Sequence, residues 1–113
     1  DLSIGNILWS EGGVGLIDWE FSRVGDPAEE LAYLLTEQAA DPELAATVHA
    51  AYLEAGGEAG IWSRVPAYGL FTALDSALWW LDYGDRHDSP EGPREIAARV
   101  EMAARWLAGE ITG

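Results

Sequence analysis

The sequence has 113 residues, which is enough for one domain but not for two or for an array of repeats. Hydrophobic residues make up 49% and charged residues 23%, so the chain can bury a core and is not a disordered tail. It has no cysteine, which excludes disulfides, thiolate metal sites and cysteine nucleophiles. No stretch approaches the roughly 18 apolar residues of a membrane span, and the first residues lack a secretory pattern. We therefore expect a cytoplasmic protein with no membrane partner.

The charge balance is strongly acidic. Twenty acidic residues against six basic ones, all of them arginine, give a net charge of −14. Such a chain repels phosphate backbones, so we expect no nucleic-acid partner. The excess of acids reflects either a cationic ligand or a general surface bias such as salt adaptation. Their spread along the whole chain favours the surface bias and leaves the cationic ligand open.

The first predicted elements are two short strands. Residues 7–9 and 14–17 are apolar and β-favouring, and residues 10–13 between them, Ser-Glu-Gly-Gly, tolerate the positive φ angles of a tight turn. The pattern predicts a β-hairpin. Because an isolated two-stranded hairpin is only marginally stable, we expect it to pack on helices or to belong to a larger sheet.

Two Asp-Pro pairs predict the starts of the next two elements. Asp26 and Asp41 are expected to be helix N-caps, each followed by a proline at the first helical position. Glutamates follow in the first turn, where the helix dipole favours anions. The first helix is expected to end near residue 39, and the second before the glycine pair at 56–57.

Two further helices are predicted in the second half of the chain. They cover about residues 63–83 and 93–108, with a polar turn at 84–93. The apolar spacing predicts core faces made by Tyr68, Phe71, Leu74, Leu78 and Leu81 in the first of these helices, and by Ile96, Val100, Ala103 and Leu107 in the second. The expected fold class is α+β, mostly α: one β-hairpin followed by about four helices, in one structural unit.

Three oxygen-bearing side chains flank the predicted hairpin. Asp1 and Asn6 lie in the segment that enters the first strand, and Asp18 ends the second strand. The segment that enters the first strand and the end of the second strand lie at the same open end of the hairpin. The three side chains can therefore converge. Phosphoryl transfer from ATP requires a carboxylate to orient the attacking hydroxyl and hard oxygen ligands for Mg²⁺. Asp1 suits the first role, and Asn6 and Asp18 suit the second.

The chain resembles the C-terminal lobe of the aminoglycoside phosphotransferase and choline kinase-like phosphotransferases, which have a protein-kinase-like fold. The resemblance is close over residues 1–35 and is carried by Asp1-Leu2-Ser3-Ile4-Gly5-Asn6-Ile7-Leu8, Leu16-Ile17-Asp18-Trp19-Glu20-Phe21, and Gly25-Asp26-Pro27 with Glu30-Leu31-Ala32. It implies that Asp1 is the catalytic base of a His-Gly-Asp-x-x-x-x-Asn loop. It also implies that Asn6 and Asp18 bind the Mg²⁺ that accompanies ATP.

The resemblance has further implications for organisation and substrate. Residues 1–24 would form the catalytic loop and metal-binding hairpin, and residues 25–113 a helical, substrate-side subdomain. The N-terminal lobe, with the lysine that contacts ATP, is expected elsewhere in the same protein, because this chain has no lysine. The 113 residues alone are therefore expected to be inactive. The implied acceptor is a hydroxyl of a small molecule, such as an aminoglycoside, choline or a related alcohol.

Two other functions remain open at this point. One is a non-catalytic helical scaffold, a degenerate kinase lobe that binds a protein partner through its tryptophan-rich face. The other is a metal-dependent hydrolase that uses Asp1, Asp18 and Glu20, which ranks last because no histidine ligand lies at a useful spacing.

The aromatic residues and histidines of the helical half have two interpretations. Trp79, Trp80 and Tyr83 either pack in the core, which is favoured, or form a wall that binds a cationic amine. His49 and His87 are isolated in sequence and are expected to lie at the surface or to have ordinary hydrogen-bond partners.

Overall fold

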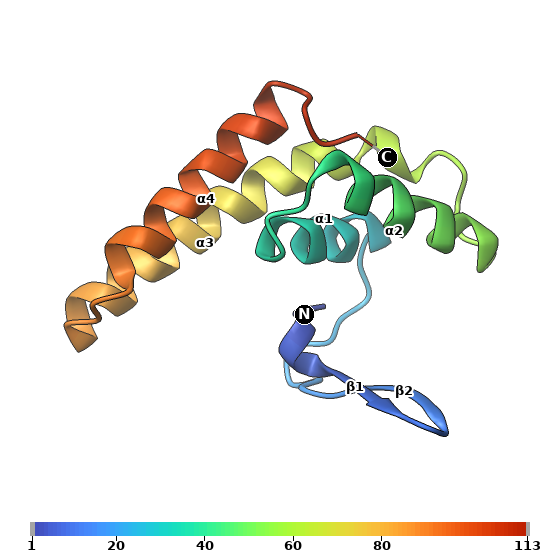
Figure 1. Cartoon of the computed structure of the whole chain (residues 1–113), viewed down its shortest axis with the longest axis horizontal. Helices are drawn as coiled ribbons and strands as arrows, with labels where there is room; N and C mark the ends of the chain where they lie inside the picture. Colours follow the sequence, from blue (N-terminus) through green and yellow to red (C-terminus); the bar gives the residue numbers. More distant parts are fainter. Residues whose placement is uncertain (1, 113) are drawn as a thin grey trace.

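The computed structural model describes residues 2–112 and shows a mostly helical α+β chain with one hairpin and four α-helices (Figure 1). The elements are β1 Ile7–Ser10, β2 Gly13–Leu16, α1 Pro27–Glu37, α2 Pro42–Glu54, α3 Val65–His87 and α4 Gly92–Leu107, with short 3-10 turns at Ile4–Asn6 and Ile61–Ser63. This confirms the predicted order of elements. No helix within the described residues is both long enough and apolar enough to cross a membrane.

The hairpin is antiparallel and tight. Its register runs from the pair of Ile7 and Leu16 to the pair of Ser10 and Gly13, which leaves a two-residue turn. Gly13 has a φ of 130°, a conformation that favours glycine. All hairpin residues except Ile7 are exposed, and the hairpin projects away from the helices (Figure 1). Within residues 2–112 it therefore adds little to the core and has no third strand.

Both predicted helix starts are confirmed. The Asp26 carboxylate accepts a hydrogen bond from the Ala28 N–H at 3.0 Å, and the Asp41 carboxylate accepts one from the Leu44 N–H at 2.8 Å. Each aspartate therefore satisfies one of the backbone donors that a helix N-terminus leaves unpaired. Because the cap is a local interaction, neighbouring residues alone were enough to predict it.

The long antiparallel pair of α3 and α4 forms the largest helix contact of the fold (Figure 1). α3 extends four residues past the predicted end at 83 and stops at Asp88, whose φ of 49° is left-handed. Small residues allow the close approach: Gly69 lies directly against the Trp106 indole, and a Cβ on Gly84 would be 3.6 Å from the Cα of Gly92.

The predicted core face of α3 is wrong. Phe71, Leu74, Leu78 and Leu81 are between 48% and 70% exposed, and only Tyr68 of the five packs partly against the core. The residues that α3 buries lie on the opposite side and are Val65, Gly69, Thr72 and Ala73. Large apolar side chains predict which face is hydrophobic, but the small-residue face is the one that α1 and α4 can approach closely.

The predicted core face of α4 is partly wrong for a related reason. Ala103 is buried as expected, whereas Val100 and Leu107 are exposed. Met102 and Trp106 take their place in the core. The Trp106 indole N–H also donates to the Thr36 hydroxyl at 3.0 Å, so the helix is rotated to meet α1. The core consists of Ala28, Leu31, Ala32, Leu35, Ala40, Ala45, Ile61, Val65, Ala73, Met102, Ala103, Trp106 and Ile111.

Candidate functional site

Asn6 and Asp18 lie at the same open end of the hairpin. The Asn6 carbonyl accepts a hydrogen bond from the Ile17 N–H at 3.0 Å, which extends the strand pairing one step beyond Ile7 and Leu16. Asp18 is the next residue along the chain. The structure therefore brings Asn6 and Asp18 together, although 12 positions separate them. Asp1 lies outside the described residues.

Asp18 has an unusual backbone conformation. Its φ is 65°, in the left-handed region that non-glycine residues rarely adopt and that aspartate tolerates better than most. The Trp19 indole N–H donates to the Leu16 carbonyl at 2.8 Å and closes the turn around Asp18. Such conformations persist only where the surrounding structure holds them in place, and they are enriched at functional sites.

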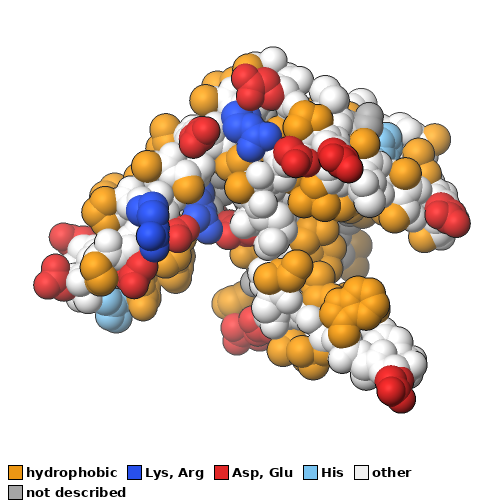
Figure 2. All heavy atoms as spheres, viewed as in Figure 1, with side chains coloured by type: hydrophobic (Ala, Val, Ile, Leu, Met, Phe, Trp, Pro, Cys, Tyr) orange, Lys and Arg blue, Asp and Glu red, His pale blue; other side chains and the backbone are white. Residues whose placement is uncertain are grey.

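A cleft of about 890 Å³ opens between the end of the hairpin and the helices, and Figure 2 shows that the molecule is hollowed on this side. This volume is within the usual range for small-molecule sites. The cleft joins the hairpin residues to charged and aromatic side chains of α1, α3 and α4. Its lining includes Asn6, Asp18, Trp19, Asp26, Glu30, Tyr33, Glu37, Asp75, Ser76, Trp79, Trp80 and Arg99.

Aromatic side chains of α3 form one wall of the cleft. Trp79 stacks on Tyr83 with ring centroids 4.8 Å apart and an angle of 11°, and Trp80 meets Trp79 edge-on at 5.2 Å. Trp79 is exposed, so the favoured prediction that it packs in the core is wrong. Trp80 is partly buried, and both tryptophans line the cleft. The arrangement provides aromatic faces, which cation–π binding requires, beside carboxylates that also attract cations.

An ion-pair network lies where three helices meet at the cleft. Arg99 of α4 donates to Glu37 of α1 at 2.7 Å, and Ser76 of α3 donates to the same carboxylate at 3.0 Å. The Arg99 Nε also donates to the Ser76 hydroxyl at 3.2 Å, and Glu95 pairs with the same guanidinium. The Arg99 and Glu37 side chains are only 13% and 16% exposed. Local sequence patterns could not predict this network, since Glu37 and Arg99 are 62 positions apart.

Glu30 is a second residue whose role was not predicted. Its carboxylate accepts a hydrogen bond from the Leu2 backbone N–H at 3.0 Å. It therefore fixes the backbone immediately after Asp1, on the segment that leads to Asn6. The sequence placed Glu30 only in the first turn of a helix, and its contact with Leu2 depends on tertiary structure.

The structure perturbs the protonation of Tyr33, which lines the cleft from α1. Burial raises the pKa of the Tyr33 phenol, and the nearby carboxylates of Glu37 and Glu30 raise it further. The phenol is therefore protonated throughout the physiological range and can act as a hydrogen-bond donor in the cleft.

The described residues contain no group of three or more histidine, aspartate or glutamate side chains that could hold a metal ion. Asn6 and Asp18 nevertheless fit Mg²⁺, which typically takes one or two protein oxygens and completes its shell with water and phosphate oxygens. His49 stacks on Trp62 at 4.9 Å, and its buried Nε2 has no hydrogen-bond partner among residues 2–112, so the expectation of an ordinary partner is wrong for that atom within this range. His87 is exposed, as expected, and packs against Tyr83.

Comparison with known proteins supports the sequence resemblance. The profile of the Phosphotransferase enzyme family matches residues 1–68, which include the hairpin, α1 and α2. No curated protein and no solved structure matches the chain. The matched region is more than half of the chain and contains Asp1, Asn6 and Asp18. The chain therefore belongs to the Phosphotransferase enzyme family.

Proposed function

We propose that this chain is the catalytic-loop and substrate-binding portion of an ATP-dependent kinase that phosphorylates a hydroxyl group of a small molecule. The observation that carries the proposal is the hydrogen bond from the Ile17 N–H to the Asn6 carbonyl, which places Asn6 and Asp18 together at one edge of the cleft. Family membership supplies the class of reaction. The proposal includes the division into a catalytic hairpin region at 1–24 and a helical subdomain at 25–113, in a protein-kinase-like C-terminal lobe.

Each of the three residues that flank the hairpin, Asp1, Asn6 and Asp18, has a proposed role. Asp1 orients the acceptor hydroxyl and takes its proton as the oxygen attacks the γ-phosphate of ATP. Asn6 and Asp18 hold Mg²⁺ through an amide oxygen and a carboxylate oxygen. Bound Mg²⁺ would neutralise charge on the phosphates. Because the chain has no lysine, we propose that an N-terminal lobe of the same protein supplies the ATP-binding cation.

The cleft favours an acceptor that carries a positive charge. Trp79 offers an exposed indole, and Asp75 lies one helical turn before it on the same wall. Aromatic faces beside carboxylates bind ammonium groups well. We therefore propose an amine-bearing alcohol as the acceptor, such as an aminoglycoside or choline.

The proposed function is tested on the full-length protein, with the proposed N-terminal lobe present, by calorimetric titration with ATP in the presence and absence of Mg²⁺. The unaltered protein should bind ATP in a Mg²⁺-dependent manner, and Asp18→Asn should weaken that binding by about tenfold or more, since the negative charge of the carboxylate ligand is lost. Asp82→Asn, on the exposed side of α3, is the matched control and should bind normally. A non-catalytic scaffold would show no Mg²⁺-dependent binding, which would reject the proposal.

A second measurement tests the role of Asp1. Phosphate transfer from ATP to aminoglycosides and choline is followed in the full-length protein with and without Asp1→Asn. We expect kcat to fall by about a hundredfold or more, because general-base catalysis typically contributes 10²- to 10⁴-fold. A near-normal kcat would remove Asp1 from this role.

A further inference from the structure

The first turn of α1 contacts both segments that carry the proposed Mg²⁺ ligands, residues 2–6 and residues 17–25. Asp26 caps this turn and ends the irregular segment 17–25, which begins at the strand end and carries Asp18. Glu30, in the same turn, holds the Leu2 N–H on the segment that leads to Asn6. The positions of both proposed Mg²⁺ ligands therefore depend on how this turn is placed.

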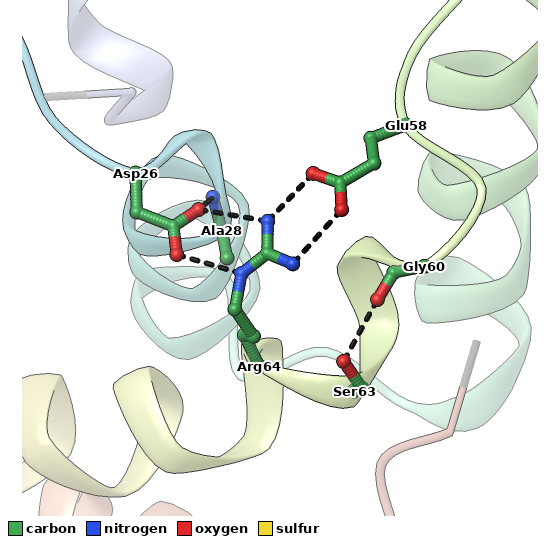
Figure 3. Close-up of polar contacts among 6 residues, drawn as sticks. All are labelled: Asp26, Ala28, Glu58, Gly60, Ser63 and Arg64. Atoms are coloured by element: carbon green, nitrogen blue, oxygen red, sulfur yellow. Dashed lines mark hydrogen bonds and ion pairs between the residues drawn. The ribbon is translucent and has the colours of Figure 1, made fainter.

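Arg64 fixes this turn to the rest of the fold, as Figure 3 shows. Its Nε donates to one oxygen of Asp26 at 2.7 Å and its Nη2 to the other at 3.2 Å. The same guanidinium donates to both oxygens of Glu58, at 3.0 and 2.7 Å. Arg64 immediately precedes α3, and Glu58 lies in the loop after α2. One arginine therefore ties the N-terminus of α1 to two other parts of the chain.

Asp26 performs two tasks at once. One of its oxygens accepts from the Ala28 N–H as the helix cap while both accept from Arg64. The hydrogen bond from Arg64 is the main cause that lowers the pKa of Asp26, and Arg64 likewise lowers the pKa of Glu58. These carboxylates therefore remain ionised and bound to Arg64 across the physiological pH range.

The ion-pair cluster of Asp26, Glu58 and Arg64 is partly exposed, so its effect on orientation can differ from its effect on stability. The side chains of Arg64 and Glu58 are 37% and 55% exposed, and ion pairs in such positions add little to global stability. The planar guanidinium fork, however, fixes direction at two carboxylates at once. The cluster therefore fixes the relative orientation of the segments that carry Asp26, Glu58 and Arg64, and adds little to global stability.

We infer that Arg64 is a positioning residue for the proposed phosphotransfer, because it fixes the α1 turn that holds the segments carrying Asn6 and Asp18. The inference rests on the proposed function of the hairpin end. It concerns the placement of the Mg²⁺ ligands, and Arg64 itself contacts neither of them in the hydrogen bonds that define the cluster.

Four substitutions separate positioning from helix capping. Asp26→Asn keeps an oxygen that can cap α1 but removes the charge that binds Arg64, because asparagine is as good an N-cap as aspartate. Asp41→Asn makes the same change at the cap of α2, which has no arginine partner among its hydrogen bonds. Arg64→Lys keeps the charge but loses the fork, and Arg64→Gln loses both.

Two readouts are measured on each variant of the full-length protein: the Mg²⁺ concentration that half-saturates ATP binding, and amide hydrogen exchange of residues 2–6 and 17–25. We expect Asp26→Asn and Arg64→Gln to raise the half-saturating Mg²⁺ concentration by about tenfold, as displaced ligand supports do. Exchange in both segments should accelerate. Arg64→Lys should be intermediate, and Asp41→Asn should match the unaltered protein in both readouts.

The inference is overturned if Asp26→Asn and Arg64→Lys bind Mg²⁺ and ATP like the unaltered protein, whatever happens to their melting temperatures. If Arg64→Gln fails to fold, Asp26→Asn and Arg64→Lys decide the matter by the same criteria. If the unaltered protein shows no Mg²⁺-dependent ATP binding, the proposed function fails separately. Unchanged exchange of both segments in Asp26→Asn would then also reject the positioning role, and accelerated exchange would support it.

Discussion

The Leu2 backbone N–H donates to the Glu30 carboxylate at 3.0 Å, although the two residues are 28 positions apart. This contact joins the segment that follows Asp1 to the first turn of α1. It makes α1 a support for the proposed catalytic loop, because the backbone on one side of Asp1 cannot move without breaking a hydrogen bond to a carboxylate. Hydrogen bonds to charged groups are stronger than those between neutral groups.

The first prediction concerns this contact. Glu30→Ala should accelerate hydrogen exchange at the Leu2 amide and weaken Mg²⁺-dependent ATP binding by about tenfold, which corresponds to about 1.4 kcal/mol. Glu30→Gln retains an oxygen acceptor and should keep most of the affinity. Nuclear magnetic resonance and calorimetry measure the two quantities. Wild-type affinity in Glu30→Ala would show that the contact does not support the site.

The second prediction concerns the contact between α3 and α4. A Cβ on Gly69 would overlap the indole of Trp106, which is only 3% exposed and cannot move away. Gly69→Ala should therefore lower the free energy of unfolding, since overpacking costs about 1–3 kcal/mol. Gly84→Ala is the control in the same helix: its Cβ would make an ordinary contact at 3.6 Å, so helix propensity should stabilise the protein by up to about 1 kcal/mol. Urea unfolding of both variants checks the difference, and equal effects would contradict the packing.

The third prediction concerns the ion pair of Arg99 and Glu37, whose side chains are mostly buried. Arg99→Met should lower the free energy of unfolding by about 3 kcal/mol, because Glu37 would keep only its hydrogen bond to Ser76. Arg86→Met breaks the exposed pair with Asp82 and should change stability by less than about 1 kcal/mol. Thermal and urea unfolding measure both variants. Similar losses of unfolding free energy in Arg99→Met and Arg86→Met would show that burial does not increase the contribution of the Arg99–Glu37 pair.

A double substitution sharpens this third prediction. Adding Glu37→Leu to Arg99→Met removes the uncompensated carboxylate and should recover part of the lost stability. A further loss would mean that Glu37 contributes mainly through Ser76.

The fourth prediction concerns pH. Arg64 lowers the pKa of Asp26 below its ordinary value of 3.8. A carboxylate with a lower pKa in the folded state stabilises the fold above its unfolded pKa, and this contribution disappears as the pH falls through the folded pKa. The stability difference between the unaltered protein and Asp26→Asn should therefore be constant above about pH 5 and shrink below about pH 4.

The carboxyl carbon shift of Asp26 provides a direct check of this fourth prediction. Its titration midpoint should lie below 3.8 in the unaltered protein and move upward in Arg64→Gln, because Arg64 is the main cause of the shift. A midpoint at or above 3.8 in the unaltered protein would contradict the ion pair.

Local signals in the sequence were sufficient for the elements and for part of the site. The Asp-Pro pairs at 26 and 41 predicted two helix starts, and the turn at 10–13 predicted the hairpin, because caps and tight turns depend on hydrogen bonds between near neighbours. The hairpin also placed Asn6 and Asp18 at one end, since strand pairing joins the residues that flank it. Their chemical roles, like that of Asp1, remain predictions.

Tertiary structure alone decided which helix faces are buried and what lines the cleft. The apolar spacing of α3 predicted burial of Leu78, and only the close approach of α1 and α4 to α3 selected the small-residue face that contains Ala73. The links from Glu30 to Leu2 and from Arg64 to Asp26 join residues 28 and 38 positions apart. The sequence by itself determined what each segment can form, because those preferences depend on neighbouring residues. The fold determined which distant side chains meet, because that depends on how whole helices pack together.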